Sequence, residues 1–320
     1  MAAIIELRDL TKQYGELTAV DALNLRIEEG AVFGFIGPNG AGKTTTMRML
    51  TTLLRPTSGE AYIAGHSVID DPHAVRRVIG YMPDFFGVYE DMKVWEYLDF
   101  FAACYDILPA ARSGIVDDLL ALVDLSHKRE AYVETLSRGM KQRLCLARTL
   151  THDPQVLILD EPAGGLDPRA RIELRELLRE LQKMGKTIFF SSHILSEVAD
   201  ICTSIGVLEN GRLVAAGNVS EMMARLRAHR LITMRFVPGA AVDVEEAMLS
   251  LRGEPGVQSV TAETGEGLLP KLQIDFSGDD VALSELLARA IGRGWPVLAF
   301  NEESGDLEDV FLQVTKGTLD

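Results

Sequence analysis

A run of eight residues near the N-terminus has the composition and spacing of a loop that binds phosphate groups. Residues 37–44 fit the pattern G-x-x-x-x-G-K-[ST], which ends in Lys43 and Thr44. Glycines let consecutive backbone N–H groups wrap an anion, the lysine reaches the β- and γ-phosphates, and the threonine hydroxyl binds Mg²⁺. The pattern predicts a site for a nucleoside triphosphate with Mg²⁺. The residues assigned to it are Gly37, Pro38, Asn39, Gly40, Ala41, Gly42, Lys43, Thr44 and Thr45.

Two carboxylates end a short apolar segment in the middle of the chain. Residues 156–159 are all aliphatic, and Asp160 and Glu161 follow them. Side chains alternate along a strand, so these two carboxylates are expected to point in different directions. One can hold Mg²⁺ while the other orients or deprotonates a water molecule. Alone, the pair also fits a strand that ends at the surface. Together with the phosphate loop, it predicts Asp160 as a metal ligand and Glu161 as a general base.

The elements that must position these residues are predicted to alternate between strands and helices. An apolar strand at 31–36 precedes the phosphate loop, and a helix over 42–54 follows it. Further buried strands are expected at 156–159 and 187–190, with a helix over 169–184 between them. Such alternation is typical of α/β domains with parallel sheets, so the first ~220 residues are predicted to form one.

Four other segments resemble motifs of the ATP-binding cassette (ABC) family. Leu136-Ser137-Arg138-Gly139-Met140 is similar to the family's signature Leu-Ser-Gly-Gly-Gln, and Asp167 in Gly-Leu-Asp is similar to its D-loop. His193 resembles the switch histidine, and Tyr14 resembles the aromatic residue that stacks on adenine. The resemblance implies a nucleotide-binding domain with a phosphate-loop core, an antiparallel β subdomain and a helical subdomain. It also implies that ATP bound to one subunit is contacted by the signature of a second.

The resemblance assigns roles to particular residues. Lys43, Glu161 and His193 become catalytic, with His193 at the γ-phosphate. The signature residues that would contact the partner's ATP are Ser137, Arg138, Gly139 and Met140. Ser137 is also a plausible helix N-cap, which would leave free N–H groups beside a phosphate.

Two positions depart from the family pattern. Asp84 stands where the family has the glutamine of its Q-loop. A carboxylate there can still accept a hydrogen bond from metal-bound water, so Asp84 joins Thr44 and Asp160 as a candidate Mg²⁺ ligand, although it also fits a simple turn. In the signature, Arg138 replaces a glycine, and the sequence leaves open whether it adds a charged donor or points away.

Several aromatic residues follow Asp84 in the sequence. The family uses this region to receive its membrane subunit, and an exposed apolar patch would serve as a docking site. We expect docking for Phe85, Phe86 and Tyr89, and core packing for Trp95.

The C-terminal third has a different character. The predicted boundaries are residues 1–220 for the nucleotide-binding domain, 221–230 for a polar linker helix and 231–320 for an accessory domain. The order of the predicted elements, βαββαβ followed by a helix over 306–315, is typical of a ferredoxin-like α+β module. No catalytic cluster is recognisable in it, and its position alone favours dimer contact or regulation.

Composition limits the classes of protein that remain. The chain has 320 residues, of which 47% are hydrophobic, and a net charge of −15. The acidic balance argues against nucleic-acid binding. No apolar run approaches the ~20 residues of a membrane-spanning helix, and no secretory signal is visible. Three scattered cysteines are expected to be buried thiols in a reducing compartment. These observations predict a cytoplasmic protein that reaches the membrane only through a partner.

The predicted function is therefore the ATPase subunit of an ABC transporter, acting as a pair beneath a separate permease. The sequence of the signature and the closing segment at 307–312 resemble ABC-2-type exporters of drugs and lipids. An ATPase subunit of an importer is the nearest alternative. A non-hydrolysing regulatory subunit and a non-transport ABC protein are further alternatives.

Overall fold

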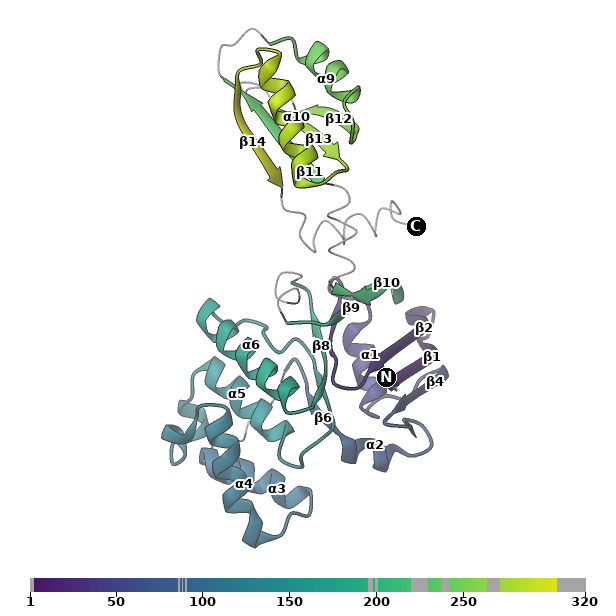
Figure 1. Ribbon diagram of the computed structural model, residues 1–320. Helices are drawn as coiled ribbons and strands as arrows, with labels where there is room; N and C mark the ends of the chain where they lie inside the picture. The colour runs from purple at the N-terminus through teal and green to yellow at the C-terminus, as the bar shows by residue number, and fades with distance from the viewer. Residues whose placement is uncertain are drawn as a thin grey trace. The chain divides into compact units, whose positions relative to one another are not determined.

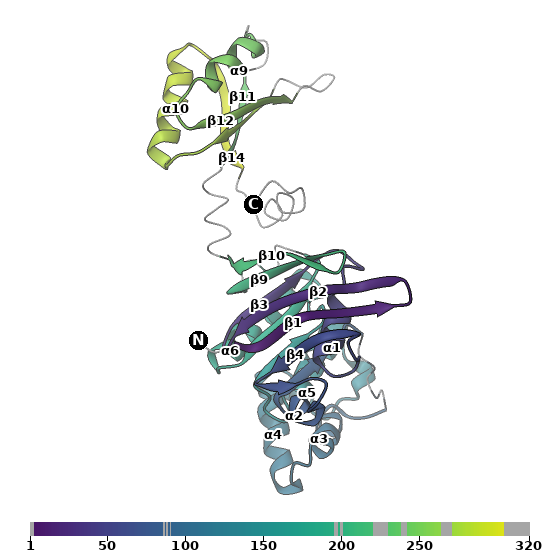
Figure 2. The same cartoon turned by 90° about the vertical axis from the view of Figure 1, so that its right-hand side faces the viewer.

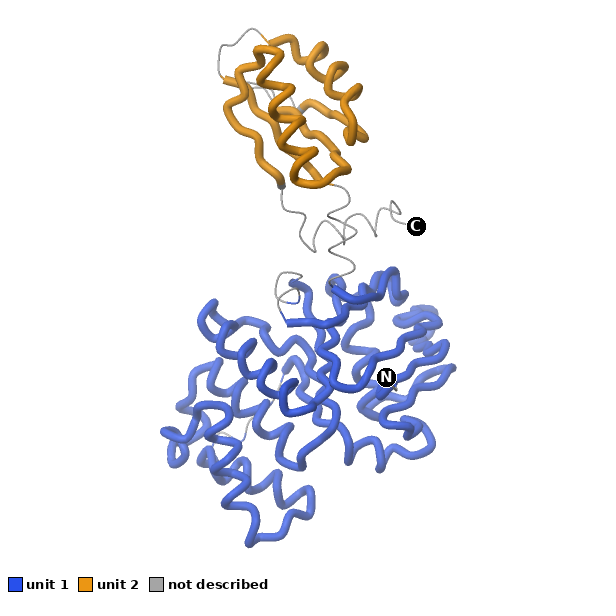
Figure 3. Tube along the Cα trace, viewed as in Figure 1, with its two compact units in different colours: residues 1–219 blue, residues 220–320 orange. Residues whose placement is uncertain are grey.

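The chain forms two compact units, residues 1–219 and residues 220–320 (Figure 3). Each unit has a sheet and a hydrophobic core of its own. The computed structural model describes residues 3–85, 87, 89, 91–194, 198, 201–219, 230–237, 242–263 and 271–303.

A mixed sheet forms the centre of the first unit. Its order across the described residues is β10-β9-β3-β8-β7-β6. The pairs from β9 to β6 are parallel, and β10 is antiparallel to β9. The strands are β3 (Val32–Ile36), β6 (Ile79–Met82), β7 (Val156–Leu159), β8 (Thr187–Ser192), β9 (Ser204–Glu209) and β10 (Arg212–Asn218). β3, β7 and β8 are buried along their whole length, as parallel strands covered on both faces should be.

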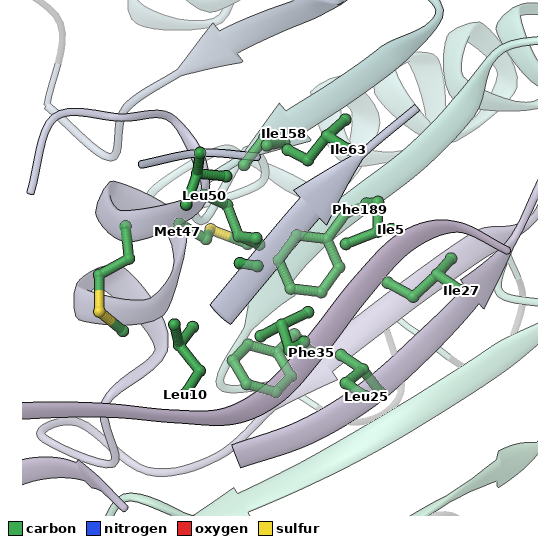
Figure 4. Close-up of a cluster of buried hydrophobic side chains, with 14 of the residues drawn as sticks. Ile5, Leu10, Leu25, Ile27, Phe35, Met47, Leu50, Ile63, Ile158 and Phe189 are labelled. Carbon is green, nitrogen blue, oxygen red and sulfur yellow. The ribbon is translucent and has the colours of Figure 1, made fainter. Parts of the chain in front are cut away.

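An antiparallel sheet packs against this centre. Its order is β2-β1-β4-β5, from β1 (Ala3–Tyr14), β2 (Leu17–Glu28), β4 (Ser58–Ile63) and β5 (His66–Ser67). Figure 4 shows that aliphatic side chains of β1 and β2 lie close to Phe35 and Phe189 of the mixed sheet and to Met47 of helix α1 (Lys43–Leu50). This shared core fixes α1, and with it the phosphate loop, between the two sheets.

The remaining helices of the first unit are α2 (Pro72–Val78), α3 (Val94–Cys104), α4 (Pro109–Leu122), α5 (Arg138–Thr149) and α6 (Pro168–Lys183). Short 3₁₀ turns occupy Ser126–Lys128 and Val133–Thr135. Helices α3, α4 and α5 contact one another, and α3 and α4 lie far from β1 and β2 (Figures 1 and 2). The three parts predicted from the ABC resemblance are therefore all present. The cysteine prediction was partly wrong, because Cys104 at the end of α3 is exposed.

The second unit has the predicted βαββαβ order. Its elements are β11 (Arg230–Phe236), α9 (Val244–Arg252), β12 (Val257–Glu263), β13 (Lys271–Phe276), α10 (Asp280–Gly292) and β14 (Val297–Glu303). The strand order is β12-β13-β11-β14, all antiparallel, which is the ferredoxin-like arrangement. Both helices pack on one face of the sheet through apolar residues such as Leu251 and Leu286 (Figure 2).

One boundary of the predicted linker helix is wrong. Arg230 begins β11, where it pairs with Phe276, and its guanidinium contacts Glu302 and Asp280. The rest of that helix and the predicted helix over 306–315 lie outside the described residues. Within the described ranges, no helix has both the length and the apolar character required to cross a membrane.

Candidate active site

The phosphate loop connects β3 to α1, and its backbone needs glycine at two places. A Cβ on Gly37 would lie 2.3 Å from the carbonyl oxygen of Leu208. Gly42 has a φ of 108°, and a Cβ there would lie 2.5 Å from the carbonyl oxygen of Ala19. Gly42 is also the N-cap of α1 and provides no side-chain cap. The first N–H groups of the helix are therefore available to an anion, together with the positive end of the helix dipole.

Lys43 is held inside this loop. Its Nζ donates to the carbonyls of Gly37 (2.7 Å) and Pro38 (3.2 Å) and lies 3.6 Å from Oε1 of Glu161. The side chain is buried, and burial lowers the pKa of Lys43, while the negative charge of Glu161 opposes that change. The loop carbonyls and Glu161 thus fix the position of the ammonium group.

Asp160, at the end of β7, is fully buried. Its Oδ1 accepts a hydrogen bond from the hydroxyl of Ser191 (2.6 Å), whereas no hydrogen-bond partner of Oδ2 exists in the described part of the chain. Burial raises the pKa of Asp160, and the nearby hydroxyls of Ser191 and Thr44 oppose the rise. A buried carboxylate oxygen without a partner is costly, so its presence indicates a ligand position. A hydroxyl and one carboxylate, completed by phosphate and water, suit Mg²⁺.

Glu161 points to a different set of groups. Its Oε2 lies 2.9 Å from Nδ1 of His193, and its Oε1 faces Lys43. The prediction that the two carboxylates point in different directions is confirmed. Glu161 also has a φ of 48°, a strained conformation for a residue with a side chain. Its N–H donates to the hydroxyl of Ser191 (2.9 Å), which therefore orients both acids.

The signature residues gather at the start of α5. Ser137 is the N-cap and accepts the N–H of Met140 (3.3 Å), as predicted. Asp167 is the N-cap of α6 and accepts the N–H of Ala170 (2.9 Å). Figure 1 shows these two helices side by side. One cavity is lined by residues from both helix starts, namely Ser137, Arg138, Gly139, Met140 and Asp167.

Arg138 contacts its own chain. Its Nη2 donates to the carbonyl of Gly164 (3.1 Å), in the loop that follows Glu161. This contact shows where the guanidinium is directed within its own chain, whereas a donor role toward a partner's ATP stays a prediction.

The predicted residues at the edge of the site have simpler surroundings. Tyr14 is 48% exposed at the end of β1, with Nζ of Lys12 5.2 Å from its ring centroid. Asp84 is exposed, and its Oδ1 accepts the N–H of Phe85 (2.7 Å), the contact expected of a turn acid. The negative charge of Asp84 still contributes to the raised pKa of Asp160.

The aromatic residues after Asp84 divide into two groups. Phe85 is 84% exposed and Tyr89 is 54% exposed, whereas Tyr97 is fully buried. Trp95 is partly buried, with the guanidinium of Arg129 over its ring. Phe86 lies outside the described residues.

Sequence reasoning gave no role to two side chains that the structure brings into the site. Ser191 joins Asp160 to Glu161, and Gln142 of α5 donates to the carbonyl of Pro162. The available signals were the two serines that follow the apolar run 188–190 in β8 and a glutamine one helical turn after Arg138.

A glycine-rich loop between a buried parallel strand and a helix, next to an acidic strand end, defines a nucleoside-triphosphate-binding α/β protein. Comparison with known proteins identifies the family. The family model described as "ABC transporter" matches residues 20–164. The chain is 33% identical to Nod factor export ATP-binding protein I of Ralstonia nicotianae, over 98% of this chain and 94% of that protein. It is 34% identical to the bacitracin transport ATP-binding protein BcrA of Enterococcus faecalis, over 99% and 98%.

A solved structure of a dimeric ATP-binding cassette with ADP and Pi has 25% identity and a TM-score of 0.62, covering 67% of this chain and 98% of that one. This chain belongs to the ABC transporter family of ATP-binding proteins, and its activity is ATP hydrolysis.

Proposed function

We propose that this chain is the ATP-hydrolysing subunit of an exporter of drugs, lipids or other amphiphiles. Two such cassettes would act beneath a separate permease in the membrane. The support is the match along almost the whole chain to relatives named for Nod factor export and bacitracin transport. These names favour export over the importer alternative.

In this proposal the phosphate loop and Lys43 bind the triphosphate of ATP, and Tyr14 stacks on adenine. Thr44 and Asp160 would hold Mg²⁺, which offsets the negative charge of the phosphates. Support comes from the buried Oδ2 of Asp160, which has no hydrogen-bond partner in the part of the chain that the structure describes. Asp84 would join through a water molecule, since its carboxylate keeps further acceptor positions while Oδ1 accepts the N–H of Phe85.

Glu161 would be the general base and His193 the residue that contacts the γ-phosphate. The observation that carries this assignment is the carboxylate of Glu161, which lies between Nζ of Lys43 and Nδ1 of His193. That position holds a proton acceptor beside the cation that binds the phosphates, so a water attacking the γ-phosphate can be oriented and deprotonated there.

The partner cassette would be met at the cavity between the starts of α5 and α6. Ser137, Gly139 and Met140 lie at a helix N-terminus, where free N–H groups favour a phosphate. Asp167 lines the same cavity. Phe85 and Tyr89 would contact the permease, since exposed aromatic side chains of this size mark a docking surface.

The two compact units support a division into two domains. We assign residues 1–220 to the cassette and residues 230–320 to an accessory domain, joined by residues 221–229. A truncation near residue 220 that leaves dimerisation and transport unchanged would contradict a role for the accessory domain in dimer contact or regulation.

The experiment that tests the function is Mg²⁺-dependent ATP hydrolysis by the full chain and by Glu161→Gln. Loss of a general base typically lowers a rate by about 100-fold or more. We expect this loss with ATP binding retained. Glu176→Gln, an exposed glutamate on α6, is the matched control and should hydrolyse ATP normally. Full activity in Glu161→Gln, or the same loss in the control, would contradict the assignment.

A further inference from the structure

The loop after β7 carries Glu161 in a conformation that needs support from its surroundings. A positive φ at a residue with a side chain persists only where neighbouring contacts fix it. Two bonds fix the start of this loop: the hydroxyl of Ser191 holds the N–H of Glu161, and the N–H of Gly164 donates to the carbonyl of Glu161 (2.9 Å). The carbonyls of Pro162 and Gly164 take their partners from outside the loop.

Helix α5 supplies both partners. Gln142 donates to Pro162, and Nη2 of Arg138 donates to Gly164. The two side chains are four residues apart, so they lie on the same face of α5 and reach the loop together. Gly165 leaves the space that the guanidinium needs, because a Cβ at Gly165 would lie 2.3 Å from Nη2 of Arg138.

The stability of α5 does not explain an arginine at position 138. Arg138 is the first residue of the helix, and a cation in the first turn opposes the helix dipole. The cap is already provided by Ser137. What the arginine adds is a charged donor to a loop carbonyl, and such bonds are stronger than those between neutral groups.

We propose that Arg138 is a positioning residue for Glu161 of its own chain. It fastens the loop over residues 161–165 to the start of α5. This inference rests on the proposed pairing of cassettes, in which the same helix start faces the partner's ATP. The loop would then be joined to the element that senses whether the partner has bound ATP. Without Arg138 the loop relaxes, and a small displacement of a catalytic group is enough to slow the reaction.

The first measurement is the steady-state ATP hydrolysis of Arg138→Ala. We expect kcat to fall by about tenfold with the KM for ATP within about twofold of the wild type. Arg179→Ala is the matched control, because Arg179 is an arginine of α6 that pairs with Glu176 and is not among the residues that line the cavity between the starts of α5 and α6. It should retain the wild-type kcat. Thermal unfolding of Arg138→Ala should match the wild type, because the helix loses an unfavourable charge and keeps its cap.

The second measurement separates positioning within the chain from a contact with the partner's ATP. ATP-driven dimerisation is followed in the Glu161→Gln background, with and without Arg138→Ala, and with Ser137→Arg as the disrupting control. We expect Arg138→Ala to leave the dimer dissociation constant within about twofold, while Ser137→Arg abolishes dimerisation. Dimerisation weakened by about tenfold in Arg138→Ala, or an unchanged kcat, would overturn the proposal. If Glu161→Gln alone fails to dimerise with ATP, the pairing of cassettes fails, and the comparison of kcat with KM still decides the role of Arg138.

Discussion

Asp160 in the first unit and Glu254 in the second are both buried carboxylates with different surroundings. Among the described residues, one oxygen of Asp160 is bonded to Ser191 and the other has no hydrogen-bond partner. Glu254 has Oε2 2.6 Å from Nε of Arg289 and Oε1 against Nη2 of Arg293. Burial raises the pKa of Glu254, but the hydrogen bond and charge of Arg293, with Arg289, outweigh it and leave the pKa lowered, whereas the pKa of Asp160 is raised.

The difference contrasts a carboxylate that is paired within the fold with one that we propose as a Mg²⁺ ligand. A buried charge that is fully paired holds two parts of a structure together, and removing one partner is costly. A buried charge that is only partly hydrogen-bonded lowers the stability of the chain, so another role must account for it. Protein engineering can test this contrast directly.

The largest expected effect is the loss of ATP hydrolysis in Asp160→Asn. Without the carboxylate that would hold Mg²⁺, the rate should fall by roughly 100-fold or more, because a bound metal contributes several kcal/mol to such reactions. The melting temperature should stay unchanged or rise, since the substitution removes a charge that burial penalises. Asp118→Asn, an exposed position on α4, should change neither quantity. A large drop in melting temperature with normal hydrolysis would indicate instead that Asp160 stabilises the fold and has no role in hydrolysis.

Glu254→Gln is expected to lower the stability of the second unit while leaving ATP hydrolysis nearly unchanged. It leaves two arginines facing a neutral amide, which should lower the unfolding free energy of the second unit by about 1–3 kcal/mol. ATP hydrolysis should stay within twofold of the wild type. The chain has two tryptophans, and only Trp295 lies in the second unit. Denaturant unfolding followed by fluorescence in a Trp95→Phe background therefore reports on this unit, and an unchanged midpoint would count against the paired role of Glu254.

Acidification should change the stability difference between the wild type and each of these two variants. Because the pKa of Glu254 is lowered, its contribution is complete above the ordinary glutamate pKa of about 4.3 and is lost as the pH falls through the lowered value. The stability gap between wild type and Glu254→Gln should therefore close in acid. For Asp160 the raised pKa means that the cost of burying the charge begins to fall once the pH drops below that value, and it is gone below the ordinary aspartate pKa of about 3.9. Any advantage of Asp160→Asn at neutral pH should vanish there.

The smallest expected effect is at the exposed edge of the site. Tyr14→Ala should raise the KM for ATP by about three- to tenfold, in line with about 1 kcal/mol for stacking of a base on an aromatic ring. Tyr14→Phe keeps the ring and should behave like the wild type. Equal KM values in all three proteins would remove Tyr14 from the adenine site.

The amino-acid sequence determined the parts of this protein that depend on neighbours along the chain. The spacing of residues 37–44 predicted the phosphate loop, because the turn and the helix start are built from adjacent residues. The apolar run before Asp160 predicted a buried strand with acids at its end. Periodicity likewise predicted the βαββαβ order of the second unit.

Only the tertiary structure decided the contacts between distant residues. Ser191 reaches both Asp160 and Glu161 because β7 and β8 run in parallel with Leu159 opposite Phe190, a register that no local pattern specifies. The partner of Arg138 was open in the sequence for the same reason, since Gly164 lies 26 residues further along the chain. The sequence fixes which chemical groups are present and which of them are neighbours along the chain. The packing of strands and helices fixes which distant groups come into contact.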